Sequence, residues 1–136
     1  MSTPAQDTVA SGAFSLGHCL RAWQALAAEA DAPLAVLEAE SDVTGAELAA
    51  LSRILSKLRS ILEDVYKARI TIPSANTVAA CLEMLENDYQ LKETIVRTME
   101  CEQPTAAHVA TFRALWRVQP YLDETVLGNA VTAMEK

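Results

Sequence analysis

One uninterrupted run of apolar residues at helical spacing, from Thr44 to Arg69, constrains the fold more than any other part of the chain. Thr44 is followed three residues later by Glu47, which is the spacing of a capping box at a helix N-terminus. Ile54 and Ile61 widen the apolar stripe on one side, so it suits the core of a helical bundle better than an isolated two-stranded coiled coil. The seam itself recurs at steps of three and four residues: Leu48, Leu51, Leu55, Leu58, Leu62 and Val65.

The whole chain has the composition of close-packed helices. Hydrophobic residues make up 51% of the 136 residues, whereas only 5% are aromatic and only four are glycine. We therefore predict a single all-α domain over residues 14–136, a bundle of four to six helices built around a long central helix at about residues 44–70. Residues 74–100 are its predicted antiparallel neighbour. Residues 1–13, which are mostly small and polar, are predicted to form a flexible tail.

Helix boundaries before the central helix follow from a cap and a proline. Ser15 is predicted to begin the first helix, in which Trp23 anchors an apolar face. Pro33 must interrupt or restart that helix because its ring clashes with the preceding turn and it lacks an amide hydrogen. Asp31 suits the N-cap of a short second helix over residues 34–40.

Boundaries after the central helix are less sharply marked. The apolar pattern weakens around Asp88, so residues 74–100 form either one helix or two helices with Asp88 as the second cap. We favour one continuous helix. Thr105 is predicted to cap the following helix, and Pro120 either kinks it or opens the last one, over residues 121–134.

The charge distribution excludes some partners. A net charge of −7 argues against a nucleic-acid binder or a protein that binds anionic membranes, because both of those surfaces are themselves negative. Residues 48–70 carry five bases and two acids, so the central helix is a basic rod in an acidic chain. Arg53, Lys57 and Lys67 are expected at solvated positions that pair with acidic neighbouring helices; the alternative is a binding strip for an acidic partner. No run of 18 apolar residues occurs, so we expect no membrane span.

The cysteine pattern favours a reducing compartment. Cys19, Cys81 and Cys101 stand far apart, each within an apolar helical pattern. A disulfide framework would need an even and denser set, so we expect small buried side chains in the cytoplasm. The N-terminus has neither the charged region nor the apolar region of a secretory signal, which fits the same location.

The sequence lacks the common motifs of metal, cofactor and covalent chemistry. The histidines and cysteines are not in C-x-x-C or H-x-x-x-H spacing, which would place two ligands on one helical face. A G-x-S-x-G elbow and a G-x-x-x-x-G-K-[ST] phosphate loop are both missing. We therefore predict no metal, no cofactor and no enzymatic activity.

One short segment carries a resemblance. Residues 17–22, Gly-His-Cys-Leu-Arg-Ala, resemble the A-H-x-L-K-G signature of histidine phosphotransfer domains, which are helical bundles of similar size. The resemblance implies that His18 accepts a phosphoryl group and that Arg21 stabilises its charge. Arg21 and Ala22 stand where the family has Lys and Gly. Alternatively, His18 is an ordinary first-helix residue beside the apolar face that Trp23 anchors.

The leading functional hypothesis is a small non-enzymatic protein that acts through protein–protein contacts. Its predicted partner is a second copy of itself, in a homodimer. The apolar seam of the central helix could be either the interface of that dimer or the core of a single chain. Phosphotransfer through His18 is the alternative function.

Overall fold

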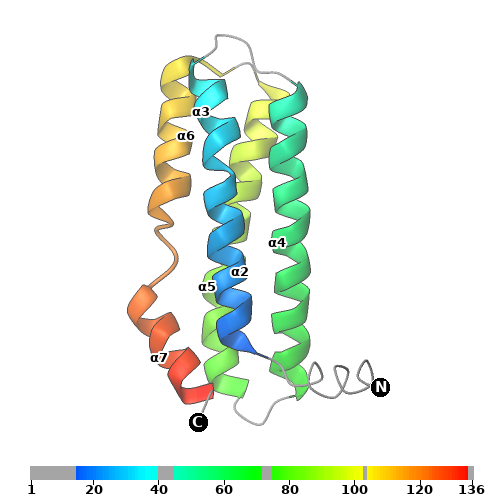
Figure 1. Ribbon diagram of the computed structural model, residues 1–136, viewed down its shortest axis with the longest axis vertical. Helices are drawn as coiled ribbons and strands as arrows, with labels where there is room; N and C mark the ends of the chain where they lie inside the picture. Colours follow the sequence, from blue (N-terminus) through cyan, green and yellow to red (C-terminus); the bar gives the residue numbers. More distant parts are fainter. Residues whose placement is uncertain (1–14, 40–44, 72–74, 103, 135–136) are drawn as a thin grey trace, which may run out of the picture.

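A computed structural model describes residues 15–39, 45–71, 75–102 and 104–134 of the chain, and every regular element in those ranges is a helix (Figure 1). The predicted all-α bundle with a long central helix is confirmed. In chain order the helices are α2 (Leu16–Glu29), α3 (Asp31–Ala39), α4 (Gly45–Thr71), α5 (Ala75–Cys101), α6 (Ala106–Val118) and α7 (Glu124–Met134). The flexible tail predicted over residues 1–13 and the Thr44 cap lie outside the described residues.

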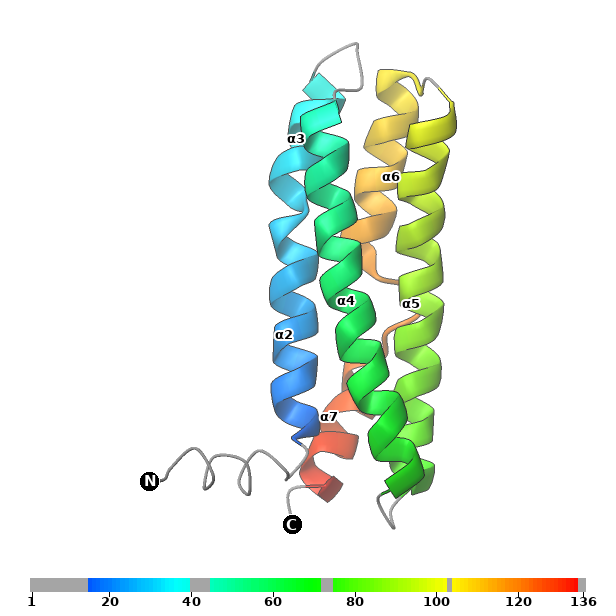
Figure 2. The ribbon, with the colours of Figure 1, turned by 90° about the vertical axis from the view of Figure 1, so that its right-hand side faces the viewer.

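The helices stand side by side as antiparallel columns. α2 and α3 stack end to end in one column, α6 and α7 form another, and the long α4 and α5 are columns by themselves (Figures 1 and 2). α4 packs most extensively on α5, whereas α6 packs mainly on α3 and α7 mainly on α5. Successive columns run in opposite directions. The apolar stripes of α2 to α6 face a shared core.

Side-chain caps begin three of these helices. Ser15 Oγ accepts a hydrogen bond at 3.1 Å from the amide three residues later, and Thr105 Oγ1 does the same at 3.2 Å. The Thr105 cap was predicted, and Ser15 was predicted as the start of the first helix. The last helix begins later than residue 121, because Asp123 Oδ1 accepts from the amides two and three residues on, at 3.0 and 3.1 Å. Pro120 lies in the connection between α6 and α7 and neither kinks the one nor opens the other.

The junction of α2 and α3 corrects the predicted role of Asp31. This residue is the first of α3 and not its N-cap, because the helical path hardly breaks: the Leu34 amide donates to the Ala30 carbonyl at 3.0 Å. Pro33 falls in the first turn of α3, where its missing amide costs little. The Asp31 carboxylate binds Arg113 of α6 instead, at 2.8 Å to Nε and 3.0 Å to the second terminal nitrogen.

The leucine seam of α4 lies in the core of its own chain. Leu51, Leu55, Leu58 and Val65 are buried, and the partly buried Leu48 and Leu62 pack against the same cluster. Two fully buried tryptophans, Trp23 from α2 and Trp116 from α6, fill the space between the columns. A smaller cluster under α7 contains Leu16, Cys81, Leu127 and Ala130. The seam therefore specifies the fold of one chain, and an interface has to use other surfaces.

α5 runs unbroken from Ala75 to Cys101, so the prediction of one continuous helix is confirmed. Asp88 does not start a second helix. It lies in the middle of α5, fully buried, where the apolar stripe of the sequence weakens.

Candidate functional site

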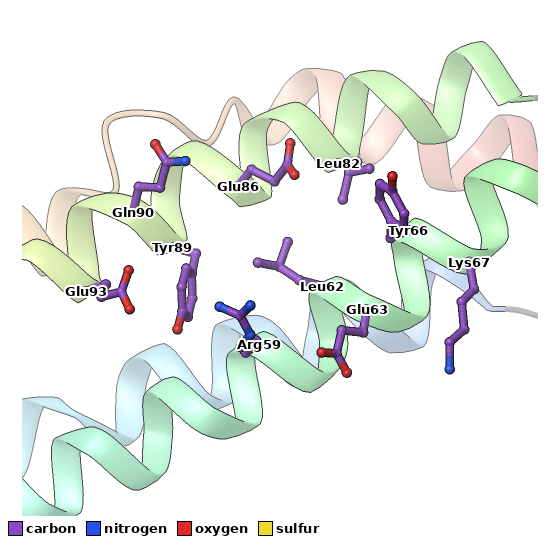
Figure 3. A pocket seen from close by; sticks show the side chains of 10 residues that line it. All are labelled: Arg59, Leu62, Glu63, Tyr66, Lys67, Leu82, Glu86, Tyr89, Gln90 and Glu93. Atoms are coloured by element: carbon purple, nitrogen blue, oxygen red, sulfur yellow. The ribbon is translucent and has the colours of Figure 1, made fainter.

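The outer face of the α4–α5 pair carries a groove of about 380 Å³ (Figure 3). We call it the α4–α5 groove. α4 contributes Arg59, Leu62, Glu63, Tyr66 and Lys67, and α5 contributes Leu82, Glu86, Tyr89, Gln90 and Glu93. These positions recur at three- and four-residue spacing, which is why they share one face of each helix.

Apolar groups form the middle of the groove and continue along α4. Leu62 and Leu82 approach from opposite sides, and Tyr66 lies beside Leu82 (Figure 3). Tyr66 is 49% exposed, and Ile70, one turn further along α4, is 69% exposed. Large side chains with apolar surface that remain in water in a groove, as Tyr66 does, or beside it on the same helix, as Ile70 does, are typical of a surface that binds another protein.

The two walls of the groove differ in charge. The α4 wall has two bases, Arg59 and Lys67, and one acid, whereas the charged residues of the α5 wall are Glu86 and Glu93. A hydrogen bond with Tyr89, followed by the nearby acids, raises the pKa of Arg59, so this base stays charged. The basic-rod pattern of the sequence thus appears as one wall of a groove whose other wall is acidic.

A second polar cluster lies inside the bundle. Asp88 and Lys92 of α5 are both fully buried, and Lys92 Nζ lies 2.5 Å from Asp88 Oδ2. The indole nitrogen of Trp23 donates to the same carboxylate oxygen at 2.9 Å. The other oxygen, Oδ1, has no hydrogen-bond partner among the described residues. We call these residues, together with Gln24, Trp116 and Gln119, the buried polar cluster.

Glutamines close this cluster on its outer side. Gln119 Oε1 accepts from Lys92 Nζ at 3.4 Å, and Gln119 Nε2 donates to Gln24 Oε1 at 2.8 Å. Lys92 Nζ also lies 5.2 Å from the centre of the Trp116 ring, a cation–π distance. Gln119 caps α6 in the left-handed region at φ 49°, where glycine is the favoured residue. Glutamine suits this position because its long amide side chain links α2 to α5 through its hydrogen bonds with Gln24 and Lys92.

Burial lowers the pKa of Lys92, and the neighbouring Asp88 opposes that shift only in part. Both side chains are shielded from solvent by the surrounding columns. The hydrogen bonds of the cluster link α2, α5 and α6, and a hollow of about 400 Å³ lined in part by Gln24, Trp116 and Gln119 lies beside it. The sequence held a signal for it: Lys92 stands seven residues after Leu85 and seven before Met99, in the phase of the core positions.

His18 and Arg21, the candidate phosphotransfer residues, are exposed on α2. They are three residues apart and so lie on the same side of the helix. The His18 amide is held by the Ser15 cap, and Arg21 borders a hollow of about 420 Å³ between α2 and α7. The structure leaves both side chains accessible and places them away from the α4–α5 groove.

Two of the three cysteines lie where the sequence predicts. Cys19 and Cys81 are buried free thiols, and burial raises the pKa of each; the charge of Asp64 adds to the shift of Cys19. Cys101 is exposed, which corrects the prediction that all three are buried. It follows the buried Met99 by two residues, or about 200° around the helix, and therefore faces solvent.

Within the described residues, no group of three or more His, Cys, Asp or Glu side chains could hold a metal ion. None of the described helices is both long enough and apolar enough to cross a membrane. Comparisons with protein-family models, curated proteins and solved structures find no match to this chain. Its function has to be argued from the site alone.

Proposed function

We propose that this protein is non-enzymatic and works through protein–protein contacts, with a second copy of itself as the partner. The observation that carries the proposal is the α4–α5 groove, which combines exposed apolar side chains with one basic and one acidic wall. Most of the leucine seam is buried inside the chain, whereas its partly buried Leu62 also lines the groove and is accessible to a partner there.

Hydrophobic burial supplies the driving force for such contacts. Tyr66 and Ile70 are four residues apart on α4 and expose about half and two-thirds of their side chains. Full burial of a fully exposed side chain of this size stabilises by about 1.5–3 kcal/mol, so burial of the fractions that these two residues still expose offers about 2–3.5 kcal/mol per copy. Tyrosine is also among the residues that dominate protein interfaces.

The free thiols support a cytoplasmic location. Cys19 and Cys81 are unpaired inside the bundle and Cys101 is unpaired on its surface. An oxidising compartment would tend to couple an exposed cysteine to another thiol. A reducing compartment keeps it free.

The mass in solution tests self-association. Size-exclusion chromatography with light scattering, across a hundredfold concentration range, should show a dimer of about 29 kDa, twice the 14.7 kDa chain. Ile70→Ser should shift the equilibrium towards monomer. Val118→Ser is the matched control, because Val118 is 70% exposed and also lies at the C-terminal end of its helix.

Circular dichroism should show that both variants remain helical. A wild-type chain that stays monomeric at every concentration would refute self-association. Equal effects of the two substitutions would refute the choice of face.

Phosphotransfer is the second candidate, and the exposure of both His18 and Arg21 on one side of α2 favours it. Incubation with phosphoramidate should then add about 80 Da, one phosphoryl group, in an acid-labile adduct that His18→Ala abolishes. His108 offers a matched control, because it is exposed and its amide is held by a cap in the same way as that of His18. Equal labelling of both histidines would indicate unspecific chemistry.

A further inference from the structure

We infer that α7 is a detachable cover of the bundle: it undocks from α2 and α5 as a unit while the other helices stay folded, and so opens an apolar surface between them. α7 lies beyond the end of α6, at one end of the molecule, and packs mainly on α5 (Figures 1 and 2). The inference goes beyond the proposed function and does not depend on self-association. It is carried by the apolar cluster under α7, the polar contacts of α6 and the connection between the two helices.

The residues under α7 form an apolar cluster of their own. Leu127 and Ala130 of α7 pack with Leu16 of α2 and Cys81 of α5, whereas the main core contains both tryptophans and the buried seam of α4. Two partly buried leucines touch both clusters. Within the described part of α7, every other side chain is exposed or only partly buried. Undocking of α7 therefore exposes the small cluster and leaves the main core covered.

Polar contacts hold α6 in place and stop where the connection to α7 begins. An ion pair of Arg113 and hydrogen bonds of Trp116 and Gln119 tie α6 to α3 and α2. For α7, the hydrogen bonds among described residues stay inside the helix or join it to Asp123 just before it. The contacts of α7 with α2 and α5 are thus apolar and few. A segment of this kind opens at a lower free energy than the whole domain.

The connection before α7 and the hollow beside it suit this motion. Residues 119–123 are not helical, and Gln119 has the left-handed φ of 49°, so the helical path is broken there. The hollow of about 420 Å³ between α2 and α7 leaves the contact of α7 with α2 incomplete. A helix of 11 residues is too short to be stable alone in water. Undocking and loss of the helix therefore occur in one step.

The two buried thiols report on the two clusters. Cys81 is fully buried under α7, whereas Cys19 is buried in the main core. Labelling with N-ethylmaleimide at increasing urea, followed by peptide mass spectrometry, measures how often each thiol becomes accessible. Cys81 should become reactive at urea concentrations below the transition in tryptophan fluorescence, and Cys19 only across that transition. The urea dependence for Cys81 should be the shallower one, because undocking exposes little surface.

Two results of this measurement would overturn the inference. Labelling of Cys81 that follows the global transition would mean that α7 opens only when the whole chain unfolds. Labelling of Cys81 at a rate independent of urea would mean that the reagent reaches the thiol through the hollow while α7 stays docked.

Leu51→Ala separates undocking from global unfolding. Leu51 is fully buried in the main core near the start of α4, whereas α7 packs on α5 and α2. The cavity destabilises the native and the undocked states equally relative to the unfolded chain. Labelling of Cys19 should rise by about thirtyfold or more, and labelling of Cys81 in low urea should not change. An equal rise for both thiols contradicts the inference. If Leu51→Ala folds poorly, Ile54→Val makes the same test with a smaller rise.

Gly128→Ala tests the cover from the other side. A Cβ added at Gly128 meets no atom within 4 Å, and alanine favours a helix more than glycine does. Labelling of Cys81 in low urea should therefore slow by about two- to fivefold. Gly45→Ala is the matched control, because a Cβ at Gly45 also meets no atom within 4 Å and α4 stays folded when α7 undocks. Wild-type labelling of Cys81 in Gly128→Ala, or equal slowing in both variants, would show that α7 does not control access to this thiol.

Discussion

Replacement of Lys92 by methionine is expected to destabilise the fold strongly although it preserves most of the side-chain volume. The substitution removes the ammonium group that lies 2.5 Å from Asp88 Oδ2 and leaves a fully buried carboxylate with only the Trp23 indole as a donor. Breaking a buried ion pair in this way costs about 3–5 kcal/mol. A domain of this size has a free energy of unfolding of about 5–15 kcal/mol, so about a fifth of it or more would be lost.

The double variant separates two contributions to the free energy of unfolding: the net stabilisation by the ion pair and the destabilisation by an unpaired buried charge. Asp88→Leu combined with Lys92→Met removes both charges and replaces them with apolar groups of similar volume. Its free energy of unfolding should lie above that of Lys92→Met but below that of the wild type by about 1–3 kcal/mol, because the buried Trp23 indole loses its acceptor. Urea denaturation followed by tryptophan fluorescence measures both variants, because Trp23 and Trp116 belong to the cluster.

Two results would refute this reasoning. A loss below about 1 kcal/mol for Lys92→Met would mean that the carboxylate finds water or another donor. A double variant no more stable than the single one would mean that the ion pair contributes a net stabilisation of its own.

The pH dependence of the same pair has a defined sign. Burial lowers the pKa of Lys92 from its ordinary value of 10.5, so the folded chain releases this proton at a lower pH than the unfolded chain. Between the two pKa values the unfolded state binds more protons, and the contribution of Lys92 to stability therefore rises with pH. The free energy of unfolding of the wild type relative to Lys92→Met should increase as the pH rises through the folded pKa of Lys92 towards 10.5, and a decrease would contradict the direction of the shift.

Further predictions concern other parts of the bundle. A thiol reagent should modify Cys101 rapidly and the two buried cysteines only after urea is added, whereas three fast thiols in the native protein would contradict their burial. Arg113 lowers the pKa of Asp31 below its ordinary 3.8, so this pair contributes stability above pH 3.8 that is lost as the pH falls through the folded pKa. Arg113→Gln should therefore destabilise at pH 7 and lose its effect in strong acid, as measured by urea midpoints. Gln119→Gly should be more stable than Gln119→Leu by about 1 kcal/mol, because both lose the amide bridge but only glycine relieves the left-handed backbone; equal urea midpoints would oppose this.

The sequence was most informative where helical pattern and capping chemistry acted locally. The long run that ends near Arg69 predicted α4, which ends at Thr71, because no proline or glycine interrupts its seam. Ser15 and Thr105 identified two helix starts, since an N-cap needs only the next few residues. The predicted N-cap role of Asp31 was wrong because its carboxylate binds Arg113, which is 82 residues away.

The candidate site could not be predicted from individual helices, because it depends on contacts and register between helices. The basic character of α4 was visible, but its position opposite the acids of α5 depends on the register between the two helices, which core packing sets. Asp88 was considered as a possible cap because the apolar stripe weakens there. Its partner in the structure, the Trp23 indole, lies 65 residues earlier in the chain and leaves no local sign. The heptad phase of Lys92 was the one local sign that a charged residue belongs to the core.

The long sequence separation within the buried polar cluster has a consequence for folding kinetics. α4 and α5 are neighbours in the chain and can associate early, whereas the bonds from Trp23 to Asp88 and from Trp116 to Ala27 close loops of 65 and 89 residues. Chain entropy must be lost before such distant contacts form, so they belong to the late side of the folding barrier. Substitutions in the cluster should then accelerate unfolding far more than they slow folding. The buried polar cluster thus determines the unfolding rate of the native state, and the α4–α5 hairpin determines the folding rate.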